Sequence, residues 1–551
     1  MFPYGTRGKN DFDRMGTDPT DTISPDEAGS QTSGAGAFEH MLLIFPPISK
    51  PCEPPAGIAR LAGMLKANQL PCTVWDANLD CIDTVLQQPR AWTEKRYRDA
   101  ARQSQKNIQR LKDRATYSNP DRYILSVKQL NLNLEKSGEP FQVKMGLADF
   151  EHRRFSPVRK SDLLVAAEHP ETNPFYPYLK ERLLLLLEKE YTDAIGFSLI
   201  FLSQALTTFA MIGILRKTVP EIKILLGGGL VTSWLRNTGT ENPFPGWVDA
   251  CIAGPGEKAL MTWYGRMEAS WSYGIPDYSD FPDSKYLSPG RILPYNLTYG
   301  CFWRKCSFCP ESAEGNPHCT ASPDPPLKGL QALNQSTRPD LIHVLDNAIP
   351  PAFLAEMGRG EPIARWYGYV RFSRELEDAD FCIALKKSGC VMLQVGLESG
   401  NQKVLDGMNK GITIQSATAI LKNLKAAGIA AYVYLLFGTP HEDETAARQT
   451  MAFVLEHAPA IQFMNAAIFN MPVRSSESDR FRTQPFYEGD LPLYTDFEHP
   501  AGWHRRKVRD FLDREFKRHP AIAEILHRTP PVFTSNHAPF FLPAFHRLAG
   551  R

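Results

Sequence analysis

Short apolar runs alternate with helical stretches along most of this chain, and this alternation restricts the fold more than any other feature. In the first half, the runs MLLIF, CTVWDAN, DAIGFSLI and KILLGGG are typical of buried strands, and helical segments such as 204–217 separate them. The stretch VDACIAGPGEKAL (248–260) ends the series with a short strand, a glycine-rich turn and the start of a helix. Strands that alternate with helices in this way predict a doubly wound parallel α/β domain.

A second alternating series begins near residue 294. Its strand candidates are 341–347, 364–371, 391–399, 429–438 and 461–470. Helical stretches lie between them, and the one at 417–428 ends on Gly428, a residue type that commonly stops helices. Repeated βα units of this length predict a full or partial (β/α) barrel, in which ligands bind at the carboxyl ends of the strands.

The remaining segments differ from these two series in composition. The polar N-terminal residues predict disorder, because they offer too little apolar surface to offset the entropy of ordering. A polar helical stretch inside the first domain predicts an insertion that stays outside the core. The predicted organisation is a disordered tail at 1–38, the α/β domain at 39–262 with a helical insertion at about 90–190, a linker at 263–293, the barrel at 294–470 and a small cap of helix and irregular structure at 471–551.

Charge and cysteine content indicate the general class of protein. The chain has 62 basic and 61 acidic residues, so nothing indicates nucleic-acid binding. Apolar runs such as 183–187 and 432–437 are far shorter than the ~20 residues that cross a bilayer, so no membrane association is expected. Ten cysteines scattered over 551 residues do not form a disulfide framework, and a reducing, cytoplasmic setting follows.

Three of those cysteines lie together in TYGCFWRKCSFCP, with the spacing C-x4-C-x2-C at Cys301, Cys306 and Cys309. A [4Fe–4S] cluster takes four ligands, so three thiolates leave one iron open to a substrate or cofactor. The alternative is a structural zinc site, which needs a fourth ligand such as Cys319 or His318.

This loop and its downstream context resemble the radical SAM superfamily, although the family's commonest spacing, C-x3-C-x2-C, has one residue fewer between the first two cysteines. In that family the three cysteines hold a [4Fe–4S] cluster, and S-adenosylmethionine binds the open iron through its amino and carboxylate groups. One electron, from a donor such as flavodoxin or ferredoxin, then cleaves a carbon–sulfur bond and releases a 5′-deoxyadenosyl radical. The resemblance implies these cofactors and this chemistry here.

The resemblance also implies residues that contact S-adenosylmethionine. Phe308, directly before the third cysteine, matches the aromatic residue that packs by the adenine. Glu398 in GLESG, continued by NQKVLDGMNKG (401–411), would hydrogen-bond the ribose, and the alternative is a helix-capping acid. Arg371 would pair with the cofactor carboxylate, and a surface salt bridge is the alternative.

Further along, LLFGTPHED (435–443) resembles the strand-to-loop glycine motif of the family. Leu436 would form an apolar wall, and Gly438 would permit close backbone approach to the adenine; an ordinary left-handed turn is the alternative for the glycine. The family's Gly-Gly-Glu signature for the amino group is not visible, and Asp346 and Asn347 are substitutes by position.

The first α/β series resembles the flavodoxin-like, cobalamin (B12)-binding domain that precedes many radical SAM domains. The histidine motif Asp-x-His-x-x-Gly of metabolic B12 enzymes is not present. A domain that binds no ligand is the alternative. The positions that would line a cobalamin site are Ser198, Gly227, Gly228, Gly229, Gly256 and Glu257.

The leading hypothesis is therefore a cobalamin-binding radical SAM enzyme that modifies an unactivated carbon of an unknown small molecule or peptide, with methyl transfer as the leading subclass. One alternative is a radical SAM enzyme without bound cobalamin that rearranges, cyclises or oxidises its substrate. An alternative of another class is a non-catalytic, zinc-stabilised sensor or interaction module. Among the C-terminal histidines, His537 is a candidate substrate or acid–base residue.

Overall fold

The structure, a computed structural model, describes residues 38–189, 191–266, 271–529 and 537–542. All but the last residue of the predicted disordered tail, 1–38, therefore lies outside the described residues. The element order within the described chain is strand–helix–strand at the start, a mainly helical segment, and then two successive runs of parallel strands and helices.

The first sheet has five parallel strands in the order β2-β1-β5-β6-β7. The strands are β1 (Met41–Phe45), β2 (Cys72–Asp76), β5 (Ala194–Ser198), β6 (Lys223–Gly227) and β7 (Ala250–Cys251). The strand order reverses direction between β1 and β5, which makes their carboxyl ends the switch point of the sheet.

Helices cover both faces of this sheet because its strands are apolar on both sides. Met41 and Leu43 share a core with Met64 of α1 (Ala56–Ala67) and Leu260 of α9 (Glu257–Trp263). Their neighbours on the strand belong to a second core with α7 (Leu202–Thr218) and α8 (Gly229–Thr238). The predicted doubly wound domain is confirmed.

The segment between β2 and β5 is largely helical, as predicted, but its predicted place outside the core is wrong. Tyr123, Val127, Leu130 and Leu134 of α4 are fully buried and belong to the same core as strand β1. Their spacing of four, three and four residues forms a narrow apolar stripe that the surrounding polar residues conceal. Its elements are α2 (Ala77–Gln87), α3 (Lys95–Lys112), α4 (Pro120–Gly138), the antiparallel pair β3 (Val143–Met145) and β4 (Phe150–His152), α5 (Lys160–Glu168) and α6 (Tyr176–Lys189).

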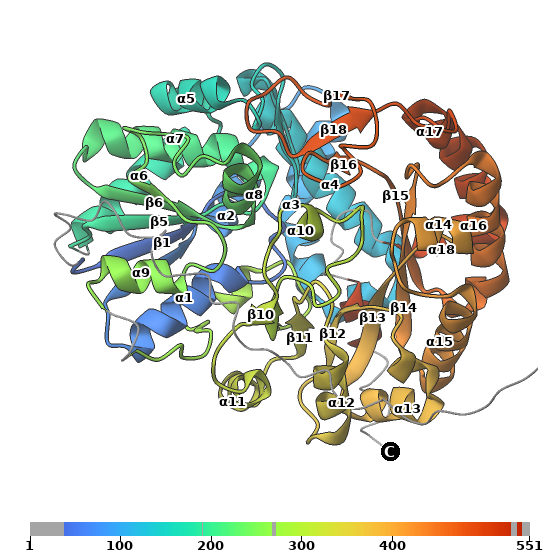
Figure 1. Ribbon diagram of the computed structural model, residues 1–551. Helices are drawn as coiled ribbons and strands as arrows, with labels where there is room; N and C mark the ends of the chain where they lie inside the picture. The colour runs from blue at the N-terminus through green and yellow to red at the C-terminus, as the bar shows by residue number, and fades with distance from the viewer. Residues whose placement is uncertain (1–37, 190, 267–270, 530–536, 543–551) are drawn as a thin grey trace, which may run out of the picture. The chain divides into compact units, whose positions relative to one another are not determined.

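The second sheet has six parallel strands in sequential order, β8-β11-β12-β13-β14-β15, and Figure 1 labels β11 to β15. The strands are β8 (Ile292–Tyr295), β11 (Leu341–Val344), β12 (Trp366–Val370), β13 (Cys390–Glu398), β14 (Ala430–Phe437) and β15 (Phe463–Ile468). The helices between them are α10 (Pro310–Ala313), α11 (Pro326–Thr337), α12 (Pro351–Arg359), α13 (Ala379–Lys387), α14 (Gln402–Gly407), α15 (Ile414–Ala427) and α16 (Glu444–His457). Sequential parallel order with intervening helices is the arrangement of the predicted partial (β/α) barrel.

The two faces of this second sheet have different surroundings. Residues such as Val370, Val395 and Val433 share a core with the helices between the strands. Their neighbours on the strands, including Leu341 and Tyr367, belong to a separate cluster that contains Ala538 and Leu542. We call this second face the inner face. By strand alternation His343, Tyr369, Arg371 and Gln394 lie on it as well.

The C-terminal region contains more regular structure than predicted. Helices α17 (Arg505–Arg514) and α18 (Pro520–Arg528) accompany a three-stranded antiparallel sheet of β16 (Met471–Pro472), β18 (Tyr494–Phe497) and β17 (Thr483–Pro485). Strand β16 has only two residues and β17 and β18 are short and mostly polar, so the sequence pattern did not indicate them. Nowhere in the described chain is a helix both long enough and apolar enough to cross a membrane.

Candidate functional site

The cysteine loop follows β8 and the short strand β9 (Thr298–Tyr299), and a segment that follows β13 and α14 holds it in place. The Ser307 backbone N–H donates to the Met408 carbonyl at 3.1 Å, and the Trp303 indole N–H donates to the Asn409 carbonyl at 3.0 Å. Gly411 is required at this contact, because a Cβ there would lie 2.1 Å from the Trp303 ring. Arg304, inside the longer first interval, has the left-handed φ of +50°.

Arg371, just after β12, contacts this loop directly. Its side chain is buried, and the guanidinium lies 3.6 Å from the Cys306 sulfur and 4.4 Å from the Trp303 ring centroid. The guanidinium also donates to the Lys410 carbonyl. The predicted alternative, a surface salt bridge, is wrong, because Arg371 is only 8% exposed.

Lys410 links the other predicted cofactor residues. Its ammonium donates to Glu398 Oε1 at 2.8 Å and lies 5.4 Å from the Phe308 ring centroid, and both partners of the ion pair are nearly buried. Glu398 adopts φ of +65° at a register shift between β13 and β14. Such strain in a non-glycine residue costs about 1–3 kcal/mol and is concentrated at functional sites.

The thiols differ in their surroundings. Burial raises the pKa of Cys306 above its ordinary value, while Lys410 and Arg371 oppose that rise. Burial raises the pKa of Cys309 to about 11, although hydrogen bonds from the backbone N–H groups of Ser312 and Glu311 act in the opposite direction and lower it. A bound metal ion would deprotonate this thiol, and the positive charge of the ion would compensate the thiolate for the loss of solvent.

No three His, Cys, Asp or Glu side chains are assembled as a metal site anywhere in the described residues, so neither a cluster site nor a zinc site is preformed. The donor set nevertheless fits an iron–sulfur cluster in kind and number, since one loop carries three thiols beside two buried cations. Cys319, a possible fourth zinc ligand, is exposed and pairs with Tyr299 in the short β9–β10 ladder, with β10 at Cys319–Thr320.

The end of β14 carries the predicted Leu436 and Gly438. Gly438 has φ of +81°, and its N–H donates to Glu442 Oε2 at 2.5 Å. Glu442 also accepts from the Trp503 indole N–H at 3.0 Å, and burial raises its pKa to about 7. Glu442 therefore fixes the turn in which the predicted adenine contact lies.

Two other predicted positions have evident structural partners. Asp346 is buried and accepts from the backbone N–H groups of Leu297 and Thr298 at 2.9 and 2.8 Å, whereas Asn347 is exposed. Asp346 thereby holds the chain that leads into the cysteine loop. His537 is fully buried, with its ring packed against Tyr432 and Phe463 on the inner face.

The predicted cobalamin residues lie along the carboxyl ends of β5, β6 and β7. Gly228 has φ of +109°, and a Cβ there would lie 2.4 Å from the Leu199 carbonyl, so the close packing of the turn requires glycine. At Gly227, Gly229 and Gly256 an added Cβ would make only ordinary contacts, the nearest at 3.8, 3.9 and 3.6 Å. Glycine at these three positions leaves space that the protein itself does not fill.

Glu257 has protein partners of its own. It is 2% exposed, lies 3.4 Å from Arg60 Nε, and accepts from the Tyr299 hydroxyl at 3.1 Å. Its carboxylate thus joins α9 to α1 and to the strand that precedes Cys301. Ser198 is half-buried at the end of β5, and its hydroxyl lies 3.6 Å from where a Cβ of Gly57 would be.

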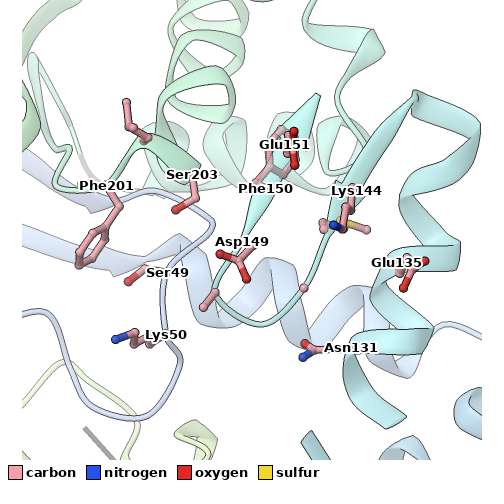
Figure 2. Close-up of a pocket in the computed structure, with 14 residues that line it drawn as sticks. Ser49, Lys50, Asn131, Glu135, Lys144, Asp149, Phe150, Glu151, Phe201 and Ser203 are labelled. Atoms are coloured by element: carbon pink, nitrogen blue, oxygen red, sulfur yellow. The ribbon is translucent and has the colours of Figure 1, made fainter. Parts of the chain in front are cut away.

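A cavity of about 650 Å³ opens at the carboxyl ends of β1 and β5 (Figure 2). The β3–β4 hairpin forms one side of it, as Figure 2 shows for Lys144, Asp149 and Glu151. Ser49, Lys50, Phe201 and Ser203 come from the segments that follow β1 and β5, so the cavity lies at the switch point of the sheet. Ligands of doubly wound sheets bind at this point.

Comparison with known proteins gives the class of this chain. Residues 368–454, from β12 into α16, match the family model of the radical SAM superfamily. This segment therefore carries the radical SAM match, and the cofactors that the match implies are a [4Fe–4S] cluster and S-adenosylmethionine. The predicted superfamily and fold class are confirmed.

Particular relatives share the fold or part of the sequence. TsrM from Kitasatospora setae, a radical S-adenosylmethionine methyltransferase solved with tryptophan substrate and a cofactor analogue, is 14% identical with a TM-score of 0.52, and the match covers 93% of this chain and 95% of that one. A second TsrM structure, with cobalamin and a [4Fe–4S] cluster bound, is 13% identical with a TM-score of 0.50, and the match covers 93% of this chain and 96% of that one. At this identity the likeness shows a shared fold.

A curated relative, bacteriochlorophyllide d C-12(1)-methyltransferase of Chlorobaculum tepidum, is 26% identical over 193 residues. The aligned part is 33% of this chain and 41% of that relative, so the match spans about two fifths of the relative's length.

Three residues of the site were not predicted from the sequence: Trp303, Lys410 and Glu442. Each lies inside a motif that was recognised, within the cysteine loop, the run 401–411 and the run 435–443 respectively. Nothing in those runs distinguishes them from solvated polar residues or an ordinary aromatic residue. Their role depends on contacts with segments distant in the sequence.

Proposed function

We propose that this chain is a cobalamin-dependent radical SAM enzyme that modifies an unactivated carbon, with methyl transfer as the leading reaction. One observation carries the proposal: Lys410 and Arg371 bring Glu398, Phe308 and Cys306 together beside one loop of three cysteines. These residues come from separate strands and loops, and their convergence fits the cofactor roles inferred for them.

The chain's own residues would act by placement and electrostatics. Cys301, Cys306 and Cys309 would ligate the cluster, and the buried Arg371 and Lys410 would offset negative charge on it and on the cofactor carboxylate. Glu398 would accept from ribose hydroxyls, and the strained backbone at this residue would hold its carboxylate in place. Bound cluster and S-adenosylmethionine would together supply a carbon radical once a donor such as flavodoxin or ferredoxin delivers one electron.

Two features support the binding of cobalamin: the fold of the first domain and the free space at the carboxyl edge of its sheet. The match with TsrM, which binds cobalamin, extends over the first sheet, and Gly227, Gly229 and Gly256 leave room at its carboxyl edge. The cavity at the switch point adds volume beside Ser49 and Ser203. The names of TsrM and of the Chlorobaculum relative both favour methyl transfer. A cytoplasmic location and an electron-transfer partner complete the proposal.

Anaerobic reconstitution tests the enzyme class. Protein supplied with iron and sulfide should hold about four of each and, after reduction with dithionite, should convert S-adenosylmethionine to 5′-deoxyadenosine without added substrate. Replacing Cys301, Cys306 or Cys309 by alanine should abolish both properties. Cys319→Ala is the matched control, because Cys319 is exposed close to the same loop. One zinc per chain with no acid-labile sulfide would instead establish the metal-stabilised module.

A second experiment separates the cobalamin enzyme from a radical SAM enzyme that lacks cobalamin. After incubation with hydroxocobalamin and desalting, the ultraviolet–visible spectrum should show one bound cobalamin. Gly229→Leu should reduce the bound amount, because the new side chain would fill the space at the edge of the sheet. Full retention of 5′-deoxyadenosine formation with no retained cobalamin would favour the second class.

A further inference from the structure

The inner face of the second sheet carries polar groups that the proposed cofactor site does not use. Below the level of Arg371 and Glu398, strands β11 to β14 place His343, Tyr369, Gln394 and Tyr434 on this face. Most inner-face neighbours on the same strands, such as Leu341, Met392 and Ala430, are apolar and form a closed cluster. Buried polar groups between an apolar floor and a cofactor site therefore need an explanation.

His343 is paired with Glu53, which lies in the segment between β1 and α1. Histidine Nδ1 is 2.9 and 3.1 Å from the two carboxylate oxygens, and both side chains are largely buried. The imidazole also stacks on the Tyr367 ring, with centroids 4.3 Å apart and planes 13° from parallel. The ring is therefore held on one face and at one nitrogen.

The pairing with Glu53 sets the tautomer of His343. A carboxylate only accepts hydrogen bonds, so Nδ1 carries the proton and Nε2 of the neutral ring is an acceptor. Nε2 is buried and has no hydrogen-bond partner within the described chain. A pair that served only to fix Glu53 to β11 would not account for an unsatisfied acceptor on the opposite side of the ring.

Gln394 presents a second acceptor of the same kind. Its amide N–H donates to the Tyr434 hydroxyl at 2.8 Å, and the Tyr369 hydroxyl donates to the same oxygen at 2.8 Å. Gln394 is 2% exposed, and its Oε1 has no hydrogen-bond partner within the described chain. Tyr434 of β14, itself held by Tyr369 of β12, thus fixes the position of the Gln394 side chain.

We propose that His343 Nε2 and Gln394 Oε1 bind the substrate by accepting hydrogen bonds from its N–H or O–H groups. Both groups are acceptors, and Glu53 adds a negative charge behind the histidine. This site takes a small molecule with amine, amide, hydroxyl or heteroaromatic N–H donors, and disfavours a phosphate or carboxylate. The inference rests on the proposed function, since it assigns the substrate class of that enzyme.

The test uses the reconstituted full-length enzyme with histidine labelled by ¹³C and ¹⁵N, and assigns the His343 signal by its loss in His343→Phe. The ¹⁵N shifts should show the Nδ1–H tautomer at pH 7.5 in wild type, and Glu53→Gln should change that tautomer balance. An Nε2–H tautomer or an imidazolium in wild type would overturn the inference.

Two pairs of probes then measure the acceptor: phenol against anisole, and indole against 1-methylindole. Phenol and indole should shift the His343 signal in a saturable titration, and their methylated partners should bind at least about tenfold more weakly, the value of one buried hydrogen bond. His343→Gln, which keeps a polar group, should retain more phenol affinity than His343→Phe. Equal binding of both members of each pair, or no shift with any probe, would overturn the inference.

The outcome is separable from the proposed function. Formation of 5′-deoxyadenosine by the wild-type enzyme without substrate tests the cluster and the S-adenosylmethionine site independently of the probes. If wild type forms no 5′-deoxyadenosine, the proposed function fails whatever the probes do. If it does, and the probes do not distinguish donors from methylated analogues, only the substrate site fails.

Discussion

The two halves of the chain each contain a buried ion pair, Arg60–Glu257 in the first and Lys410–Glu398 in the second, and the surroundings of the two pairs differ. Arg60 uses its other nitrogens on the Gly274 and Ala321 carbonyls at 3.0 and 2.9 Å, and Tyr299 donates to Glu257. Lys410 instead holds a glutamate with a strained backbone beside the cysteine loop.

The difference shows how a structural pair and a site pair are told apart. In the first pair, both partners are hydrogen-bonded to several segments of unstrained chain, which is the pattern of a buried pair that joins elements. In the second pair, the charges lie beside an aromatic ring and cysteine thiols, where a ligand would complete their surroundings. The next predictions test this contrast, from the largest expected effect on stability to the smallest.

Arg60→Met should lower the free energy of unfolding by about 3–5 kcal/mol, because it leaves Glu257 buried without its cation. Urea unfolding measures this directly. Arg60→Lys should recover only part of the loss, since an ammonium cannot reach three separately placed acceptors. The cofactor-cleaving activity per folded molecule should not change. If Arg60→Met were as stable as wild type, the Arg60–Glu257 pair would not be a structural pair.

Glu442 tests whether a buried acid at the end of the second sheet contributes to stability. Its folded pKa of about 7 exceeds the unfolded value of about 4.3, so the folded state binds more protons between these pH values, and stability falls as pH rises through them. Raising the pH from 5 to 8 should therefore lower the free energy of unfolding of the wild type by about 2.5 kcal/mol through this group. Glu442→Gln should lose that dependence while keeping an acceptor for the Gly438 and Trp503 N–H groups.

The control for this pH series is Glu444→Gln, two residues away on an exposed side chain. Its stability profile should follow wild type at every pH. A Glu442→Gln profile parallel to that of wild type would show that the charge of Glu442 is not disfavoured in the folded state.

Gly228→Ala tests the backbone packing at the end of the first sheet. Alanine would be strained at φ of +109° and would press on the Leu199 carbonyl, so we expect a loss of about 2 kcal/mol in unfolding free energy. Gly227→Ala, next to it, has its nearest contact at 3.8 Å and should cost less than about 1 kcal/mol. Thermal melts of the two variants give the comparison, and similar values would contradict it.

Neutralising the whole second pair should have the smallest effect on stability. The double variant Lys410→Met with Glu398→Gln leaves no unpaired buried charge, so its unfolding free energy should stay within about 1 kcal/mol of wild type. Equilibrium dialysis should nevertheless show S-adenosylmethionine bound about tenfold more weakly. The matched double variant, Arg60→Met with Glu257→Gln, should bind it normally. Equal losses in both would erase the distinction between the pairs.

Local pattern was sufficient for the strands of both sheets, because a buried parallel strand is a continuous apolar run between turns and helices. The same rule failed for α4, where one stripe of Tyr123, Val127, Leu130 and Leu134 is buried within a polar helix. It also failed for the polar strands β17 and β18, whose paired residues lie ten or more positions apart.

The sequence by itself determined the alternation of strands and helices, the cysteine spacing and the superfamily, because these depend on residues near one another along the chain. Only the tertiary structure decided which buried charges have all their hydrogen-bond partners within the protein and which lie beside the candidate cofactor site. Lys410, Arg371 and Cys306 are separated by dozens of residues, and the Glu53–His343 pair by 290. Parallel strands bring their carboxyl ends to one edge, so contacts made there are set by topology and burial, which sequence proximity does not record.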